Sequence, residues 1–133
     1  MRVKAAPEAV WAVLTAVENY PRWRSDVAAV ADLRAEPGLT WRETDSLGRA
    51  TLHAEGQSRV SEKWIDRTLG ADGKGSGQRV FLIVADEEGG SRVALTETRE
   101  IANPLLRFKA RFVDGYGVDA EKLMGDLRKR LAE

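Results

Sequence analysis

Hydrophobic residues recur with a helical period near both ends of the chain and with a period of two through its middle. Apolar side chains at positions 10, 11, 13, 14 and 17 follow Pro7, a residue typical of a first helical turn, and they predict a helix that Pro21 ends. A second short helical piece is predicted over residues 22–26. Alternation then predicts strands over residues 27–35, 39–46, 50–56, 63–69, 78–85 and 92–101, preceded by a short first strand at 2–5.

The last segment, residues 103–133, returns to the helical period. Asn103 and Pro104 form a favourable cap and first turn for a long helix. Antiparallel strands followed by one long helix predict an α+β domain, in which the helix packs on one face of a curved sheet. Small-molecule sites form in the gap between such a sheet and its helix. No linker or repeat is visible, so we expect residues 1–133 to form a single domain.

Lys109 lies on the apolar face of this predicted helix. It follows Leu105 by one turn, and it precedes Phe112 by three residues and Tyr116 by seven, a spacing that stacks side chains on one side of a helix. An ammonium group at such a position must be paired, must reach water or must face a cavity. Two interpretations follow. The lysine stem packs while its head reaches solvent at a cavity mouth, or the lysine lies inside a binding pocket.

Glu43 and Glu97 are the candidate partners of Lys109. Glu43 shares a strand face with Trp41, and Glu97 shares one with Leu95. If these apolar faces point inward, both carboxylates enter the cavity that Lys109 enters; otherwise they lie solvated at strand ends. A carboxylate partner would keep Lys109 protonated, whereas desolvation alone would favour a neutral, reactive amine.

The strand predicted over residues 78–85 is apolar on both faces. Phe81 and Ile83 alternate along it with Leu82 and Val84. We assign Leu82 and Val84 to the wall of the ligand cavity. Phe81 and Ile83 then lie on the outer face, where they are either covered by neighbouring side chains or form a homodimer contact.

His53 is the only histidine of the chain, and it lies on the strand face opposite Leu52 and Ala54. This alternation predicts a histidine at the surface. With one histidine and no cysteine, the sequence predicts no zinc site or other metal site, and we expect no cofactor.

The composition indicates a folded protein and argues against several classes. Charged residues make up 32% and hydrophobic residues 43% of the chain, which is typical of a globular domain. Lys and Arg together number 21, as do Asp and Glu, and this balance argues against a nucleic-acid binder with a basic surface. No apolar run approaches the ~20 residues that span a bilayer. No signal peptide is visible before the first helix, so we expect a cytoplasmic protein.

Three stretches of sequence, in this order of elements, resemble the SRPBCC superfamily, also described as START-like or polyketide cyclase/dehydrase-like. Residues 6–23 look like its opening helix pair, and residues 90–97 look like its last strand. Residues 101–112, with Asn-Pro-Leu-Leu-Arg-Phe, look like the start of its gripping helix, although relatives usually carry an apolar residue at the position of Lys109. The resemblance implies a helix-grip fold, in which an antiparallel sheet of about six to seven strands wraps around a long C-terminal helix.

The resemblance leaves the function open, because members of this superfamily bind, transport or transform many apolar ligands, lipids among them. The first hypothesis is a non-enzymatic binder of a small apolar or aromatic molecule. The second is an enzyme, either of the polyketide cyclase/dehydratase type or using Lys109 as an amine catalyst, and the third is a module that binds a protein partner. The expected ligand-binding residues are Trp41, Glu43, Leu82, Val84, Leu95, Glu97, Lys109, Phe112 and Tyr116.

Overall fold

The computed structural model describes residues 1–35, 38–55, 62–68, 76–100 and 116–132, with backbone alone at residues 76, 99–100 and 116–120. In chain order its elements are β1 (Arg2–Val3), α1 (Pro7–Thr15), the 3₁₀ helix η1 (Val17–Asn19), α2 (Tyr20–Trp23), β2 (Ala29–Arg34), β3 (Thr40–Thr44), β4 (Ala50–Glu55), β5 (Lys63–Thr68), β6 (Ser76–Ala85), β7 (Ser91–Glu100) and α4 (Tyr116–Ala132).

Helix α1 begins where the sequence places its helix-starting residues. Pro7 lies in the first turn, where its missing N–H has no helical partner to lose, and Glu8 adds negative charge near the positive end of the helix dipole. Val10, Trp11 and Leu14 are the buried side chains of this helix. Their spacing of one, three and four residues creates the apolar stripe that packs on the sheet.

Pro21 lies in the first turn of a helix and does not end one. Helix α1 stops at Thr15, η1 follows, and Pro21 is tolerated at the start of α2 because that position needs no N–H donor. The predicted helix end at Pro21 and the predicted second helix at 22–26 were therefore wrong by several residues. Tyr20, the first residue of α2, is buried, and its hydroxyl donates a hydrogen bond to the carbonyl of Leu14.

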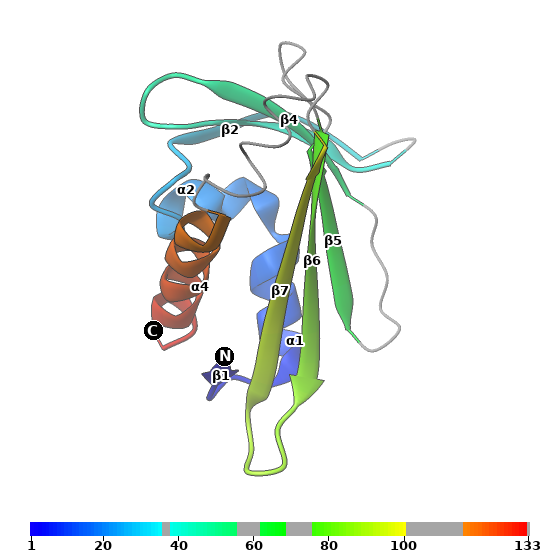
Figure 1. Cartoon of the computed structure of the whole chain (residues 1–133), viewed down its shortest axis with the longest axis vertical. Helices are drawn as coiled ribbons and strands as arrows, with labels where there is room; N and C mark the ends of the chain where they lie inside the picture. Colours follow the sequence, from blue (N-terminus) through cyan, green and yellow to red (C-terminus); the bar gives the residue numbers. More distant parts are fainter. Residues whose placement is uncertain (36–37, 56–61, 69–75, 101–115, 133) are drawn as a thin grey trace.

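In the described part of the chain, seven strands form one antiparallel sheet with the order β1-β7-β6-β5-β4-β3-β2. Figure 1 shows β5, β6 and β7 running along one side of the molecule while β2 and β4 cross its top, so the sheet is strongly curved. Helices α1 and α4 lie inside this curve, where α1 contacts β5 and β6, and α4 contacts β7 and α1. The α+β arrangement predicted from the sequence is confirmed. Of the predicted final helix, residues 116–132 are helical and residues 103–115 lie outside the described residues.

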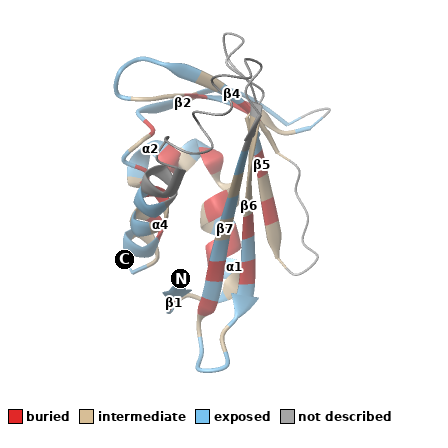
Figure 2. Ribbon diagram, viewed as in Figure 1, coloured by how far each residue is buried: buried red, intermediate tan, exposed pale blue. Residues whose placement is uncertain are grey.

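The facing of β6 is the reverse of the prediction. Phe81 and Ile83 are each 2% exposed, whereas Leu82 is 40% and Val84 48% exposed. Figure 2 shows buried and exposed segments along the neighbouring strands β6 and β7. Strand register explains this, because Phe81 lies opposite the buried Trp64 of β5 on one side and opposite Leu95 of β7, which packs against the core, on the other. Leu82 and Val84 therefore lie on the outer face and line no inner cavity, and Phe81 and Ile83 are not available for contact with a second chain.

Three tryptophans pack together at the inner face of the sheet, Trp11 from α1, Trp41 from β3 and Trp64 from β5. The rings of Trp11 and Trp64 meet edge to face at 6.1 Å, and those of Trp41 and Trp64 stack at 6.4 Å between centroids. Such pairs contribute roughly 0.5–1.5 kcal/mol each beyond the area that they bury. Leu123 and Leu127 of α4 join the same core, which fixes this helix against the sheet.

None of the helices in the described residues is long and apolar enough to cross a membrane.

Candidate functional site

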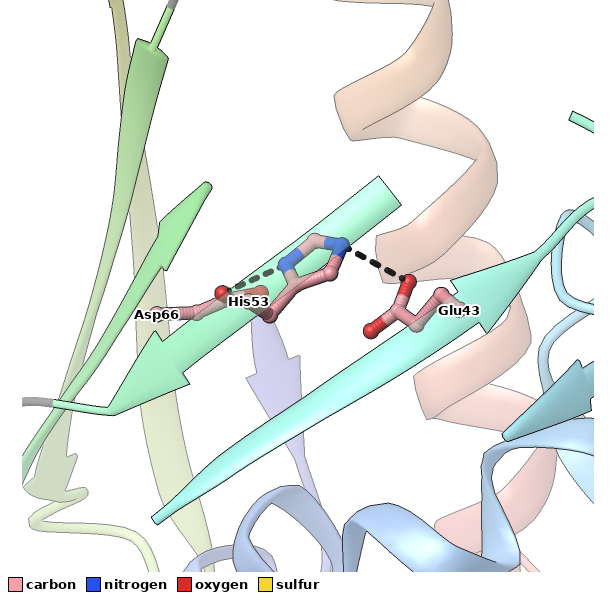
Figure 3. A group of neighbouring side chains, drawn as sticks. All are labelled: Glu43, His53 and Asp66. Atoms are coloured by element: carbon pink, nitrogen blue, oxygen red, sulfur yellow. Dashed lines mark hydrogen bonds and ion pairs between the residues drawn. The ribbon is translucent and has the colours of Figure 1, made fainter. Parts of the chain in front are cut away.

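Three titratable side chains meet on the inner face of the sheet, one each from β3, β4 and β5. The ring of His53 lies between the carboxylates of Glu43 and Asp66 (Figure 3). Its Nδ1 lies 2.8 Å from Asp66 Oδ1, and its Nε2 lies 3.5 Å from Glu43 Oε1. Because an ionised carboxylate only accepts hydrogen bonds, we assign the Nδ1 proton as the donor to Asp66. The ring nitrogen Nε2 then faces Glu43.

Glu43 is also held by Arg24 and Trp41. The indole Nε1 of Trp41 donates to Glu43 Oε2 at 2.8 Å, and Arg24 Nη1 donates to the same oxygen at 3.4 Å. Arg24 follows α2 and donates two parallel hydrogen bonds of 3.1 and 2.7 Å to the carboxylate of Asp26. Its guanidinium lies 4.8 Å from the centre of the Tyr20 ring, and its side chain is only 2% exposed. A cation this deeply buried needs such partners to offset its lost hydration.

Arg79 and Glu97 extend the charged row across β6 and β7. Arg79 is the cross-strand neighbour of both Asp66 and Glu97. Its Nε donates to Glu97 Oε1 at 2.8 Å, and its Nη1 lies 3.7 Å from Asp66 Oδ2. The polar belt, as we name this row, contains Arg24, Asp26, Glu43, His53, Asp66, Arg79 and Glu97.

The electrostatics of the polar belt favour the charged forms of Asp66, Asp26 and Arg24. Burial alone would raise the pKa of Asp66, but the hydrogen bond from His53 and the charges of His53 and Arg79 hold it below its usual range. The pKa of Asp26 is lowered in the same way against the effect of burial, by the hydrogen bonds and the charge of Arg24. Burial opposes the charged form of Arg24 as well, yet Glu43 and Asp26 raise its pKa above the ordinary value. Partners within the polar belt thus offset the effect of burial on these three groups.

Nearly the whole sequence matches a known protein family. The match covers residues 1–132, and the family is described as polyketide cyclase / dehydrase and lipid transport. The chain belongs to this family. The resemblance to the SRPBCC superfamily is thereby confirmed. No curated protein matches the sequence.

Solved structures share the fold of this polyketide cyclase/dehydrase family member. A START superfamily protein from Mycobacterium smegmatis is 16% identical with a TM-score of 0.75, and the match covers 99% of this chain and 93% of that one. The ZhuI aromatase/cyclase from a Streptomyces species is 13% identical with a TM-score of 0.79, over 99% and 90% of the two chains. Norcoclaurine synthase from Thalictrum flavum is 11% identical with a TM-score of 0.70, over 100% and 83%. At these identities the likeness concerns the fold, and it confirms the predicted helix-grip architecture.

The Glu43, His53 and Asp66 side chains of this family member also have the chemistry of metal ligands. One ligand atom from each lies within 4.8 Å of the others. However, the two ring nitrogens of His53 point in opposite directions, so one ion cannot share both of the contacts that the ring makes (Figure 3). Arg24 and Arg79 already place positive charge 3.4 and 3.7 Å from the two carboxylates. Hydrogen bonds and ion pairs therefore explain the cluster better than a metal centre does.

The structure brings four of the predicted site residues to the inner face. Trp41 and Glu43 are buried, Leu95 packs against the core, and the Glu97 side chain is 8% exposed. Leu82 and Val84 lie on the outer face, as described above. Lys109 and Phe112 lie outside the described residues. Tyr116 is the first residue of α4, and its side chain is likewise outside them.

His53 was predicted at the surface and is instead 3% exposed. It pairs across the strands with Trp41, and the two rings stack at 5.4 Å with an interplanar angle of 11°. Sequence reasoning also missed Arg24, Asp66 and Arg79. The signal that could have found His53 is the β3–β4 hairpin, because its short turn sets a register that places His53 opposite the inward-facing Trp41.

Proposed function

We propose that this protein binds a small apolar or aromatic molecule, without transforming it, on the inner face of the sheet beneath the C-terminal segment. The observation that carries the proposal is the polar belt, a row of charged side chains buried beside stacked aromatic rings. Small-molecule sites typically combine apolar walls with a few fixed polar groups. Membership of a family described as polyketide cyclase / dehydrase and lipid transport supports the binding of an apolar ligand.

The aromatic and polar parts of the proposed site lie on adjacent rows of the same strands. Trp64, Phe81 and Leu95 occupy one row across β5, β6 and β7, and Asp66, Arg79 and Glu97 occupy the next row. A ligand lying along these strands would place its apolar body on the first row and its polar end on the second. Lys109, Phe112 and Tyr116 stay predicted contributors from the helix side, and lipids stay one class of predicted ligand. A cytoplasmic location also stays a prediction.

A blocking substitution tests the location of the site. Leu95 faces inward on β7, whereas Leu82 is exposed on the outer face of the neighbouring strand β6. Leu95→Trp should fill the site and weaken binding of 1-anilinonaphthalene-8-sulfonate or a naphthalene probe at least tenfold. Leu82→Trp adds the same bulk to the other face and should leave the affinity unchanged. Absence of probe binding to the unsubstituted protein, or blocking by Leu82→Trp alone, would overturn the proposal.

One observation favours a second candidate, an acid–base enzyme. Asp66 orients the His53 ring through a 2.8 Å hydrogen bond, an arrangement that suits an imidazole for proton transfer. The other enzymatic hypothesis is that Lys109 acts as an amine catalyst. Borohydride trapping with an aromatic aldehyde tests that alternative, because a specific adduct at Lys109 requires a neutral amine at the site. A bell-shaped pH dependence of the rate of a catalysed reaction, abolished by His53→Gln, would instead support proton transfer by the imidazole.

A further inference from the structure

Three buried polar atoms on adjacent strands have no hydrogen-bond partner among the described residues. They are the indole Nε1 of Trp64 on β5, the guanidinium Nη1 of Arg79 on β6 and the carboxylate Oε2 of Glu97 on β7. Buried polar atoms of Trp23 and Glu62 lie outside these rows. Glu55 of β4 lies opposite Asp66 and takes part in an interaction of its own, so it does not belong to this group. Buried polar groups in folded proteins are nearly always satisfied, so a group of three calls for an explanation.

The three atoms belong to side chains that are otherwise well fixed. Trp64 is fully buried, and its ring contacts the rings of Trp11 and Trp41. The Glu97 side chain is 8% exposed, and its other oxygen accepts the 2.8 Å bond from Arg79. Arg79 Nη1 lies 3.7 Å from Asp66, which is beyond hydrogen-bond length. Their strand positions place them on the same face, in two neighbouring rows.

We propose that the ligand of this site carries a neutral hydroxyl group, phenolic or alcoholic, which binds at Arg79 and Glu97 with Trp64 beside it. This inference rests on the proposed binding function and names the ligand class. Two of the free atoms are donors and one is an acceptor. A hydroxyl oxygen can accept from Arg79 or Trp64, while its proton is donated to Glu97 Oε2. A hydroxyl group therefore offers both the acceptor and the donor that these atoms lack.

The charges of the row disfavour the alternatives to a hydroxyl. Arg79 is the shared partner of two carboxylates, Asp66 and Glu97, so a carboxylate ligand would meet the negative charge of Glu97. An ammonium group could bind Glu97, but it offers no acceptor to the two donors. A methyl ether accepts from Arg79 but leaves the Glu97 oxygen buried without a partner, which is unfavourable.

Matched naphthalene probes test this ligand class on the full chain, with tryptophan fluorescence as the readout. We expect 2-naphthol to bind about tenfold more tightly than 2-methoxynaphthalene, and more tightly than 2-naphthoate. Equal affinities for 2-naphthol and 2-methoxynaphthalene would overturn the hydroxyl inference and leave the proposed binding function intact. Failure of every probe to bind would overturn the binding function itself.

Glu97→Gln provides a second test that does not depend on the probe ranking alone. The amide keeps the size of the side chain, and its oxygen can still accept from Arg79 Nε, so its NH₂ group replaces the free acceptor with a donor. The preference for 2-naphthol over 2-methoxynaphthalene should then disappear, and 2-naphthoate should bind more tightly. Glu88→Gln, at a side chain that is 79% exposed, is the matched control and should change neither affinity. Retention of the naphthol preference in Glu97→Gln would contradict the assignment.

Discussion

Asp66 is the carboxylate on which the polar belt depends most, and its replacement should destabilise the fold measurably. Its side chain is 3% exposed, it accepts the 2.8 Å bond from His53, and Arg79 lies 3.7 Å away. Removing one partner of a buried ionic network leaves the other groups desolvated without compensation. Asp66→Ala therefore tests whether the belt exists as described.

The magnitude follows from what each substitution leaves behind. Asp66→Ala leaves the Nδ1 proton of His53 without its acceptor and removes the charge facing Arg79, so we expect the free energy of unfolding to fall by about 3–5 kcal/mol. Asp66→Asn keeps the size and an acceptor oxygen, and exchanges a charge-assisted hydrogen bond for a neutral one. The expected loss is then about 1–2 kcal/mol, the difference between those two kinds of bond.

Urea unfolding followed by tryptophan fluorescence measures both losses, because the tryptophans lie in the same core. Glu88→Gln is the control, since its 3.8 Å pair with Arg2 is at the surface and should contribute less than about 0.5 kcal/mol. The double substitution of Asp66 and His53 to Ala should cost less than the sum of the two single substitutions. If Asp66→Ala unfolds at the same urea concentration as Glu88→Gln, the buried His53–Asp66 bond is refuted.

Three further predictions concern packing and pH. Leu127→Ala, at a fully buried position of α4, should lower the free energy of unfolding by about 2–5 kcal/mol in the same urea assay. The control Leu47→Ala, at a residue 75% exposed, should change it by less than about 0.5 kcal/mol. Ile83→Ala should cost about 2–5 kcal/mol and Leu82→Ala less than about 1 kcal/mol, and the reverse order would contradict the facing of β6. The lowered pKa of Asp66 stabilises the fold above its unfolded pKa of about 3.9, so denaturation midpoints should fall as the pH drops below that value, and Asp66→Asn should show a smaller drop.

The order of elements could be predicted from the sequence because hydrophobic periodicity is a local property. Pro7 and Glu8 mark the start of α1, and the change from period two to a helical period separates the strands from the last helix. The boundary at Pro21 was wrong for a physical reason. A proline is compatible with a first helical turn and with a helix end, and the local sequence does not distinguish these two positions.

Which face of a strand points inward is harder to predict when both faces are apolar. Along β6, Phe81 and Ile83 cannot be distinguished from Leu82 and Val84 by alternation alone. The pairing with β7 decides, because Phe81 lies opposite Leu95 and shares its face. Leu95 was expected to face inward, so combining that expectation with the hairpin register would have corrected the facing of β6.

The candidate site could be predicted only in part, because its defining contacts join residues far apart in the sequence. Glu43 and Glu97 were expected beside apolar neighbours, but their partners Arg24 and Arg79 are separated from them by 19 and 18 residues. An unpaired buried charge is strongly unfavourable, so a charged side chain on a strand is predicted to be solvated. This prediction changes only when its partner in the fold is known.

The same reasoning explains why the belt bears on function more strongly than any single residue does. Apolar side chains could fill the inner face and stabilise the fold as well or better, since replacing a buried ion pair with hydrophobic groups is often neutral or stabilising. Stability alone therefore does not account for a row of charges beside Trp41 and Trp64. Moreover, Glu43 and Asp66 have hydrogen-bond partners in one part of the row. In the adjoining part, Arg79 and Glu97 each keep a buried polar atom without a hydrogen-bond partner among the described residues. A rigid, fully paired network next to unpaired donors and an acceptor is the arrangement expected of a preorganised site, in which the fixed charges hold the binding groups in place before a ligand arrives.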